Sequence, residues 1–462
     1  MRERKDVYKL PAGDKTLEWY SKAVLEMKKR PTTDPTSWNY QGAIHGFDAT
    51  NPFWNGAAPL PSPQEQLDFW KQCQHGSWYF LPWHRMYLAY FEQIVAKVIV
   101  DLGGPADWAL PYWNYSDTSN PNARVIPPAF TNPNNVTNGL WIAGRQSNTI
   151  PARYVTLGAL NTIPFTGDGI QSPLGFGGPK TSFSHSGRTH GELESLPHDM
   201  VHVAIGGAMG NPRTAALDPI FWLHHANIDR LWQVWLNLGR RYNPTESAWQ
   251  DLKFYFHDQN RKVVSLTSLQ VEDTRKVLSG YTYQGVPVKT SSLRNVNKIA
   301  SFQEFKRPLE VVAATNSKQL LEGSKKMVPL KITPSRRMKS NFMPLNESLK
   351  TPKRTILHFE NVTGKGVPPI HDVYVNVPEK GGDKESFYAG SLSFFGVEEA
   401  STPSAHQAGS GQHYALDVSD LMNRLRSLPN WDENAMNVSI EPSQEINDKA
   451  SVSIGRISVY SE

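Results

Sequence analysis

Cysteine is nearly absent from this sequence of 462 residues, in which Cys73 is the single thiol. An intrachain disulfide is therefore excluded, and the fold has to be stabilised by its own core. The sequence also lacks any run of roughly 20 uninterrupted apolar residues, which excludes a transmembrane helix. We find no signal peptide and expect a soluble protein, either cytoplasmic or secreted after removal of a leader.

A strong excess of charge of one sign is absent as well, since 48 Lys and Arg against 43 Asp and Glu leave a formal charge of +5. The densest basic stretch, residues 325–354, lacks the interleaved aromatics of a nucleic-acid module. We expect a solvated surface there and no nucleic-acid partner. Hydrophobic residues make up 39% of the chain, which excludes disorder along its whole length. The sequence defines no oligomeric state.

Helical periodicity dominates the first half of the chain, where apolar residues recur every three to four positions. We expect helices at residues 14–30, 64–74, 82–99, 194–206 and 218–238. A stretch rich in Asn, Pro, Gly and Thr, residues 120–180, shows only weak periodicity. A long irregular segment of this kind usually carries function or covers something.

Strand-like alternation replaces this pattern after about residue 250. The expected strands cover residues 355–359, 373–377, 391–394, 414–418, 437–440 and 451–459. We therefore expect a mainly α domain with long loops at residues 1–290, a linker with strand fragments at 291–345, and an all-β sandwich at 346–462.

Histidines concentrate in the helical half and are its main chemical feature. Imidazole is the usual protein ligand of copper, zinc and iron. His198 and His202 lie four residues apart, so on a helix both rings project from one face and can hold one ion. Alone this spacing is weak, because it often arises by chance.

A second histidine pattern lies in residues 218–232. Asp218 can cap a helix there, and Pro219 suits its first turn. His225 falls on an inward apolar stripe, whereas His224 lies about 100° away around the helix. The plain interpretation is a buried, hydrogen-bonded histidine; together with His198 and His202, however, His225 completes a set of three.

A third pattern joins His75 and His84, which would face opposite sides of one straight helix. Pro82 resolves this by starting a new helix, with His84 in its first turn and His75 ending the preceding segment. His45 completes a second set of three. Neutral nitrogen ligands in an apolar pocket favour copper that cycles between two oxidation states, and a three-histidine zinc site is the rival.

These motifs resemble those of the tyrosinase and polyphenol oxidase family of type-3 copper proteins, in its plant-type organisation, along nearly the whole chain. The matching pieces are Gln41–His45, Leu81–Arg85, Leu110–Asn114, Leu193–His198, Asp218–Trp232 and, in the sandwich, Asp372–Asn376. The resemblance implies that residues 1–290 form a catalytic domain whose four-helix bundle holds a dicopper centre. It also implies that the sandwich is a lid domain, which covers the active site in latent forms.

The resemblance assigns a role to each position that matches the family. The first copper would be bound by His45, His75 and His84, and the second by His198, His202 and His225, so that His224 is not a ligand. Glu194 would hold a water near the second copper. Asp199 departs from the pattern, since forms that hydroxylate monophenols often carry Asn there; as a catalytic residue it would help Glu194 as a base, and the alternative is that it repels carboxylated substrates. The substrate pocket would include Val203, Pro212 and Arg213, with a mouth more open than in forms that carry a gating Phe at position 212.

Cys73 departs from the plant pattern and matches the arrangement of fungal tyrosinases, in which a cysteine lies two residues before a copper ligand. We predict a thioether bond between Cys73 and His75, which would fix the ring of His75.

The implied activity is that of a phenol oxidase with two copper ions, which binds O2 as a peroxide. It would ortho-hydroxylate small monophenols and oxidise o-diphenols to o-quinones. The alternatives are a catechol oxidase or o-aminophenol oxidase that cannot hydroxylate monophenols, a hemocyanin-like oxygen carrier, and a protein that holds zinc at both sites.

Overall fold

The structure is a computed structural model, and the chain divides into two compact units that we describe separately. The first unit contains Met1–Thr166, Gly175–Ser186 and Gly191–Arg294, and the second contains Gly167–Leu174, Gly187–His190 and Asn295–Glu462. The described residues are 1–133, 137–167, 169, 174–183, 187–287, 309–321, 323–332, 354–378, 383–403, 409–428, 431–432, 435–444 and 450–461.

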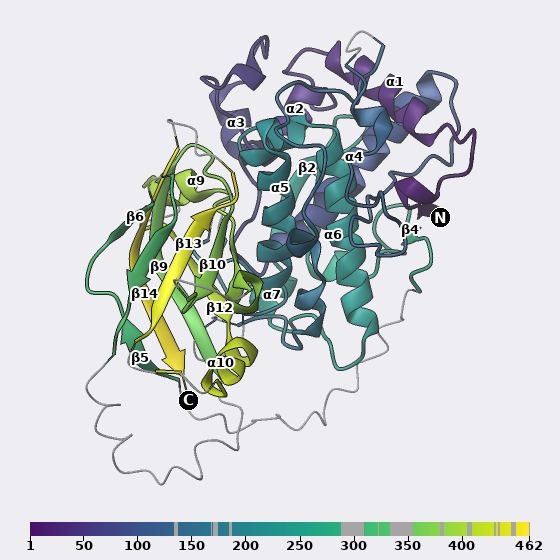
Figure 1. Cartoon of the computed structure of the whole chain (residues 1–462). Coiled ribbons are helices and arrows are strands. Elements are labelled where there is room, and N and C mark those ends of the chain that lie inside the picture. The colour runs from purple at the N-terminus through teal and green to yellow at the C-terminus, as the bar shows by residue number, and fades with distance from the viewer. Residues whose placement is uncertain are drawn as a thin grey trace. The chain divides into compact units, whose positions relative to one another are not determined.

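The first unit is mainly helical, as predicted (Figure 1). Its α-helices are α1 (Thr16–Lys28), α2 (Trp38–His45), α3 (Pro63–Phe69), α4 (Phe80–Asp101), α5 (Met200–Ile205), α6 (Ile220–Asn237) and α7 (Ser247–Gln250). Helix α4 packs against α1 and α6. Two small sheets accompany the helices: β1 (Arg2–Arg4) pairs in parallel with β4 (Tyr281–Tyr283), and β2 (Lys253–His257) pairs antiparallel with β3 (Val263–Thr267).

The two long helices form where the sequence predicts them. Helix α4 is buried along most of its length, and Pro82 lies in its first turn, where a backbone N–H is not needed. Helix α6 begins after Asp218, whose carboxylate accepts a hydrogen bond of 3.0 Å from the Ile220 amide. Such side-chain acceptors satisfy the free amides of a helix start.

The predicted helix at residues 194–206 is interrupted. Its first part is a π-helical turn, η6 (Glu194–Asp199), and Leu196 has extended backbone angles before Pro197. Helix α5 follows directly and ends at Gly206, whose φ of 65° suits glycine. Helix α2 was not predicted; it is short, and Ser37 caps it by accepting from the Tyr40 amide at 3.1 Å.

The predicted irregular stretch at residues 120–180 contains three short 3₁₀ turns where it is described: η3 (Pro128–Phe130), η4 (Ala152–Val155) and η5 (Gly158–Asn161). Positions 134–136, 168 and 170–173 of that stretch lie outside the described residues.

The second unit contains two sheets around a common apolar core (Figure 1). One sheet has the order β11 (Tyr388–Leu392), β10 (His371–Val375), β13 (Asn437–Pro442) and β7 (Lys326–Pro329). The other has the order β12 (Gln412–Asp417), β9 (Thr355–Lys365), β14 (Ser451–Ser461), β5 (Glu310–Ala314) and β8 (Lys331–Ile332), and β6 (Gln319–Leu321) also pairs with β14. Short helices α9 (Val397–Ser401) and α10 (Ser419–Arg426) complete the unit.

The strands β5 to β8 lie within the range 291–345, where we predicted a linker. β5 and β6 pair with β14, β7 pairs with β13, and β8 pairs with β5, so the structure assigns this part of the chain to the sandwich. The strands β6, β7 and β8 are short, and β7 and β8, which lie at sheet edges, each begin with a lysine. The remaining parts of the predicted linker, residues 291–308 and 333–345, lie outside the described residues.

Two segments from the middle of the chain belong to the sandwich unit. The backbone carbonyl of Arg188 accepts from the amide of His413 at 2.6 Å, and Thr189 forms a parallel β-bridge with His413. The Arg188 guanidinium also donates to the Asn361 side chain at 2.7 Å. Residues 188–189 therefore extend the sheet at its β12 edge.

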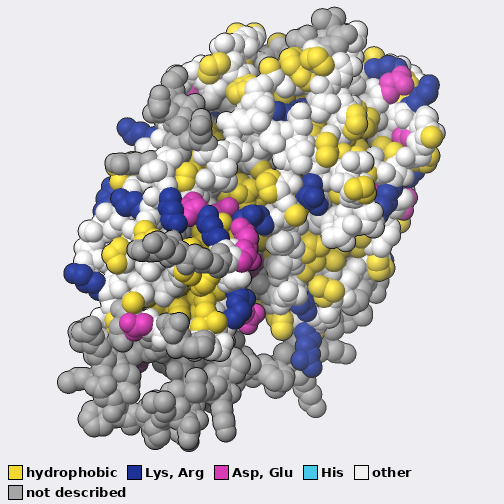
Figure 2. All heavy atoms as spheres, in the orientation of Figure 1, with side chains coloured by type: hydrophobic (Ala, Val, Ile, Leu, Met, Phe, Trp, Pro, Cys, Tyr) yellow, Lys and Arg dark blue, Asp and Glu magenta, His cyan; other side chains and the backbone are white. Residues whose placement is uncertain are grey.

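Surface charge agrees with the small net charge of the sequence. On the face drawn in Figure 2, basic and acidic side chains lie near one another. Within the predicted basic stretch, Lys325 lies 3.2 Å from Glu441, while residues 333–353 are outside the described part. Among the described residues, no helix combines the length and the apolar content needed to cross a membrane.

Candidate metal centre

The six histidines predicted as ligands converge in the first unit, although they come from six separate positions along the chain. His45 ends α2, His75 lies before α4, and His84 lies in the first turn of α4. The other three come from η6, α5 and α6: His198, His202 and His225. All six side chains are at most 4% exposed, so the group is enclosed by protein.

The first three rings form one trio. The ring centroids of His45 and His75 are 5.3 Å apart, those of His75 and His84 5.5 Å, and those of His45 and His84 5.7 Å. By the distances between ligand atoms, His45 groups with His84 and His225 and, separately, with Cys73 and His75, each group lying within 4.8 Å.

The second three rings form another trio, in which ring nitrogens approach one another closely. Nε2 of His202 lies 3.2 Å from Nε2 of His198 and 3.2 Å from Nε2 of His225. The two trios adjoin, because the rings of His84 and His225 stack with centroids 4.6 Å apart. The structure therefore brings all six predicted ligands to one place.

Backbone carbonyls fix the orientation of three of these rings. Nδ1 of His45 donates to the Pro212 carbonyl at 2.8 Å, Nδ1 of His84 to the Phe80 carbonyl at 2.8 Å, and Nδ1 of His202 to the Met209 carbonyl at 2.9 Å. A carbonyl oxygen can only accept, so the proton is on Nδ1 and the Nε2 lone pair is free to bind a metal.

The remaining hydrogen-bonding capacity of the rings also indicates a ligand. Within the described part of the chain, the buried Nε2 atoms of His45 and His84 have no hydrogen-bond partner. A buried polar nitrogen without a partner is unfavourable, and a metal ion would satisfy it. Burial lowers the pKa of His45 to about 4, and burial together with neighbouring rings lowers the pKa of His84, His198, His202 and His225. Neutral imidazoles are the form that binds metals.

His224 lies closer to this group than the helical stripe suggested. Its ligand atom is within 4.8 Å of those of His198, His202 and His225. Its Nδ1 lies 3.2 Å from the hydroxyl of Tyr115, and its buried Nε2 has no hydrogen-bond partner among the described residues. The exclusion of His224 from the ligand set stays a prediction.

The two predicted catalytic carboxylates are both buried and both hydrogen-bonded. The carboxylate oxygens of Glu194 accept from the Gly76 amide at 2.9 and 3.0 Å, directly after His75 in the chain. Asp199 accepts from Nδ1 of His198 at 2.8 Å. Asp199 is thus placed to orient a ligand ring, an arrangement that also makes the ring a better donor to a metal.

The three predicted pocket residues lie at different depths. Val203 is buried in α5, and Pro212 adjoins the first trio through its bond to His45. The side chain of Arg213 is 30% exposed and lies 3.4 Å from Asp48. Of the three, Arg213 is the one that reaches solvent.

Cys73 lies beside His75, with its Sγ 3.6 Å from Nδ1 of that ring. If the predicted thioether forms, one C–S bond replaces an S–H and a C–H bond, and the two protons and two electrons that are released go to O2 as the oxidant. We expect the denatured, metal-free protein to weigh about 2 Da less than its sequence mass, with no thiol reactivity. The Cys73→Ser variant is the control and should have its full sequence mass. A wild-type protein at full mass with a reactive thiol would reject the thioether.

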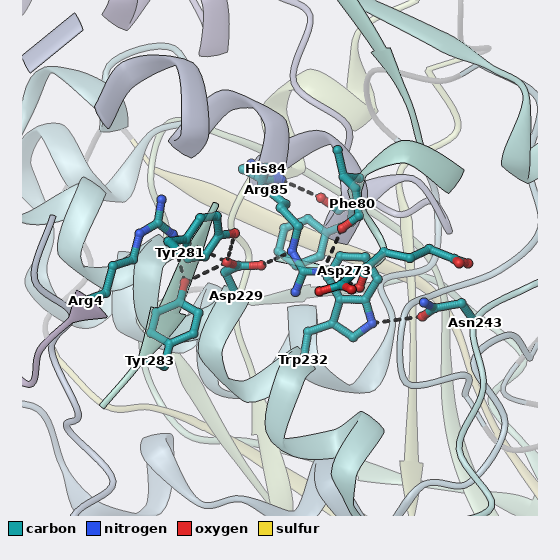
Figure 3. A network of polar contacts seen from close by, with 12 residues as sticks. Arg4, Phe80, His84, Arg85, Asp229, Trp232, Asn243, Asp273, Tyr281 and Tyr283 are labelled. Carbon is teal, nitrogen blue, oxygen red and sulfur yellow. Dashed lines mark hydrogen bonds and ion pairs between the residues drawn. The ribbon is translucent and has the colours of Figure 1, made fainter. Parts of the chain in front are cut away.

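A buried network of charged and phenolic side chains includes Arg85, which follows the predicted ligand His84, and the sequence analysis missed it (Figure 3). Asp229, one helical turn after His225, accepts from Arg85 at 2.5 Å and from the hydroxyls of Tyr281 and Tyr283 at 2.6 Å each. Arg4 lies with its guanidinium 3.7 Å from the centroid of the Tyr281 ring.

Arg4 links this network to α4, because its Nε donates to Glu92 at 2.8 Å. Burial raises the pKa of Asp229, but Arg85 and Arg4 outweigh it and hold the pKa below its ordinary value. The charges of Arg4 and Arg85 therefore compensate those of Glu92 and Asp229, and the network joins α4, α6, β1 and β4. The available signal was a pair of charged residues, Arg85 and Asp229, that lie next to long apolar stretches of the sequence.

Comparisons with known proteins agree with this geometry. Residues 35–159 and 141–238 match the common central domain of tyrosinase, residues 243–295 the polyphenol oxidase middle domain, and residues 308–462 a domain of unknown function. The chain is 44% identical to tyrosinase HcTyr1 of Hahella sp. (strain CCB-MM4), over 100% of both chains. It is 28% identical to a chloroplastic polyphenol oxidase of Malus domestica, over 92% of this chain and 72% of that one.

Solved structures show the same fold. Latent apple tyrosinase matches with a TM-score of 0.59 and 22% identity, over 100% of this chain and 97% of that one. A latent aurone synthase, also a polyphenol oxidase, matches with a TM-score of 0.61 and 22% identity, over 100% of this chain and 89% of that one. A mainly helical part followed by a β-rich part is thus confirmed.

Proposed function

Because this chain belongs to the tyrosinase and polyphenol oxidase family, we propose that it is a phenol oxidase with two copper ions that hydroxylates monophenols and oxidises o-diphenols to o-quinones. The observation that carries the proposal is the convergence of six buried histidines, in which the rings of the two predicted ligand sets adjoin. His45, His75 and His84 would hold one copper, and His198, His202 and His225 the other. When bound, the copper pair supplies activation of O2 and electron transfer from the phenol.

The protein's own part in the reaction is to hold ligands, exclude water and move a proton. The hydrogen bonds at Nδ1 keep His45, His84 and His202 in the tautomer that binds metal. A phenol has a pKa of about 10, so little phenolate is present at neutral pH. Glu194, fixed by the Gly76 amide, is positioned to take up the phenolic proton through a water, while Asp199 orients His198.

The substrates we propose are small phenols, with a preference for those that carry a carboxylate. Arg213 is the partly exposed cation of the predicted pocket, and its ion pair with Asp48 is long at 3.4 Å. A substrate carboxylate can compete for such a pair.

The test is oxygen uptake by the copper-loaded full chain with tyramine and, separately, with catechol. We expect O2 consumption and quinone formation with both. Turnover of catechol alone would identify a catechol oxidase, and reversible oxygenation without quinone would identify an oxygen carrier. Two zinc ions in the isolated protein, with no activity after copper loading, would support the zinc alternative.

We also propose that the sandwich acts as a cover of the active site. The test is cleavage of the chain within residues 288–308, followed by removal of the C-terminal fragment under conditions that keep the remainder folded. We expect the rate of catechol oxidation to rise. An unchanged rate in the separated N-terminal part would reject the cover.

A further inference from the structure

The loop formed by residues 206–214, between α5 and α6, contacts both histidine trios. It begins with Gly206 and Gly207, whose φ angles are 65° and 59°. Its backbone packs tightly there, since a Cβ atom on Gly207 would lie 2.4 Å from the Gly144 carbonyl oxygen. Only glycine combines this backbone conformation with so close an approach.

The 206–214 loop supplies one carbonyl to each trio. The Met209 carbonyl accepts from Nδ1 of His202 at 2.9 Å, and the Pro212 carbonyl accepts from Nδ1 of His45 at 2.8 Å. The two acceptors are only three residues apart. A shift of this loop would therefore rotate a ring in both ion sites at once.

Thr214 forms hydrogen bonds to two backbone carbonyls of the 206–214 loop. Its hydroxyl donates to the Ala208 carbonyl at 2.8 Å, and its amide donates to the Asn211 carbonyl at 2.9 Å. The Thr214 side chain is buried, with 1% of the residue exposed. The Ala208 carbonyl also accepts a longer bond of 3.4 Å from the Asn211 amide.

The outer side of the loop is fixed as well. The indole of Trp54 donates to the Arg213 carbonyl at 2.8 Å. Gly46, which follows the ligand His45, packs so closely that a Cβ atom there would lie 2.4 Å from the Pro212 carbonyl oxygen. The loop thus contacts the first site through the Pro212 carbonyl, which accepts from His45 and packs against Gly46. It contacts the second site through the Met209 carbonyl.

We propose that the 206–214 loop couples the two ion sites, with Thr214 as the positioning residue that holds the loop in its binding form. The inference rests on the two ion sites of the proposed function. An ion at one site fixes a ring and, through it, the loop, so the second ion binds to a ring that is already ordered. Metal uptake is therefore cooperative, and both sites depend on one threonine that contacts neither ion.

The experiment uses the metal-free full chain and Zn²⁺, which suits three-histidine sites and carries out no oxygen chemistry. Thr214→Val removes the hydroxyl while keeping the shape, and Thr214→Ser restores it. Ser116→Ala is the matched control, because the Ser116 hydroxyl also donates to a carbonyl, that of Val155, at 2.8 Å in the same unit.

We expect Thr214→Val to weaken Zn²⁺ binding at both sites together by about fivefold, the effect of one lost hydrogen bond. Thr214→Ser and Ser116→Ala should bind Zn²⁺ like the wild type. If Thr214→Val binds like the wild type, or is weakened at a single site, the inference is overturned.

A second measurement needs only the wild type and so does not depend on how the variants fold. Native mass spectrometry with one equivalent of Zn²⁺ should show chains with no ion and with two ions in excess over chains with one. A predominance of one-ion chains would overturn the coupling. A wild type that binds no Zn²⁺ would overturn the ion sites themselves, whereas independent binding of two ions would overturn the coupling alone.

Discussion

A chain that carries His225→Asn is expected to bind one copper ion where the wild type binds two, and to lose phenol oxidation by on the order of a thousandfold or more. His225 shares an ion site with His202, whose Nε2 is 3.2 Å away, and its ring stacks on His84 of the other trio. Because the proposed reaction needs both ions, loss of one removes the centre as a whole. Copper content after dialysis and the rate of catechol oxidation check this.

The matched control is His224→Asn, at the adjacent position of the same helix. Both histidines are buried, and both lie in the same group of potential ligands. The family motif assigns His225 and not His224 to the second copper, and we therefore expect this variant to retain two copper ions. If His224→Asn loses an ion and His225→Asn keeps both, the assignment of ligands in α6 is wrong.

The second large effect concerns Asp229, whose side-chain hydrogen bonds among the described residues go to Arg85, Arg4, Tyr281 and Tyr283 and not to a predicted ligand. We expect Asp229→Asn to lower the free energy of unfolding by about 3–5 kcal/mol, the usual cost of leaving a buried charge without its partner. Arg85 would lose its carboxylate contact, and both tyrosine hydroxyls would lose a charged acceptor. Denaturant titration of the metal-free chain checks this without any contribution from bound metal.

Asp101→Asn makes the same chemical change at an exposed ion pair. Asp101 accepts from Lys97 at 2.6 and 2.7 Å at the end of α4, where both side chains are about half exposed. Exposed pairs of this kind contribute little to stability, so the denaturation midpoint should not move measurably. An equal loss of stability in the two variants would mean that the buried network contributes nothing special.

Local spacing was sufficient to predict the long helices α4 and α6 but not α2, which ends at His45. His198, His202 and His225 lie on helical segments, and the four-residue spacing and the apolar stripe each specify which way a ring points. His75 and His84 could be paired once Pro82 was taken as a helix start, and the structure places Pro82 in the first turn of α4. These inferences needed only the 3.6-residue period and the properties of proline.

Contacts between distant parts of the chain could not be predicted in this way. The carbonyls that orient His45 and His202 belong to Pro212 and Met209, and nothing in their side chains marks them. Arg4 meets Asp229 across more than 200 residues, through a β-pairing of only three residues. The strands β7 and β8 were taken as linker because short edge strands that carry lysine resemble loops.

The pairing of Arg188 and Thr189 with His413 has a consequence for any attempt to make the two parts of this protein separately. A gene shortened before residue 309 still encodes residues 188–189 but not β12, and a gene for the sandwich alone encodes β12 with that edge bare. Each product would carry unpaired backbone groups that favour aggregation. The two halves have complementary strand edges. We therefore expect them to reassociate into a functional protein when they are co-expressed.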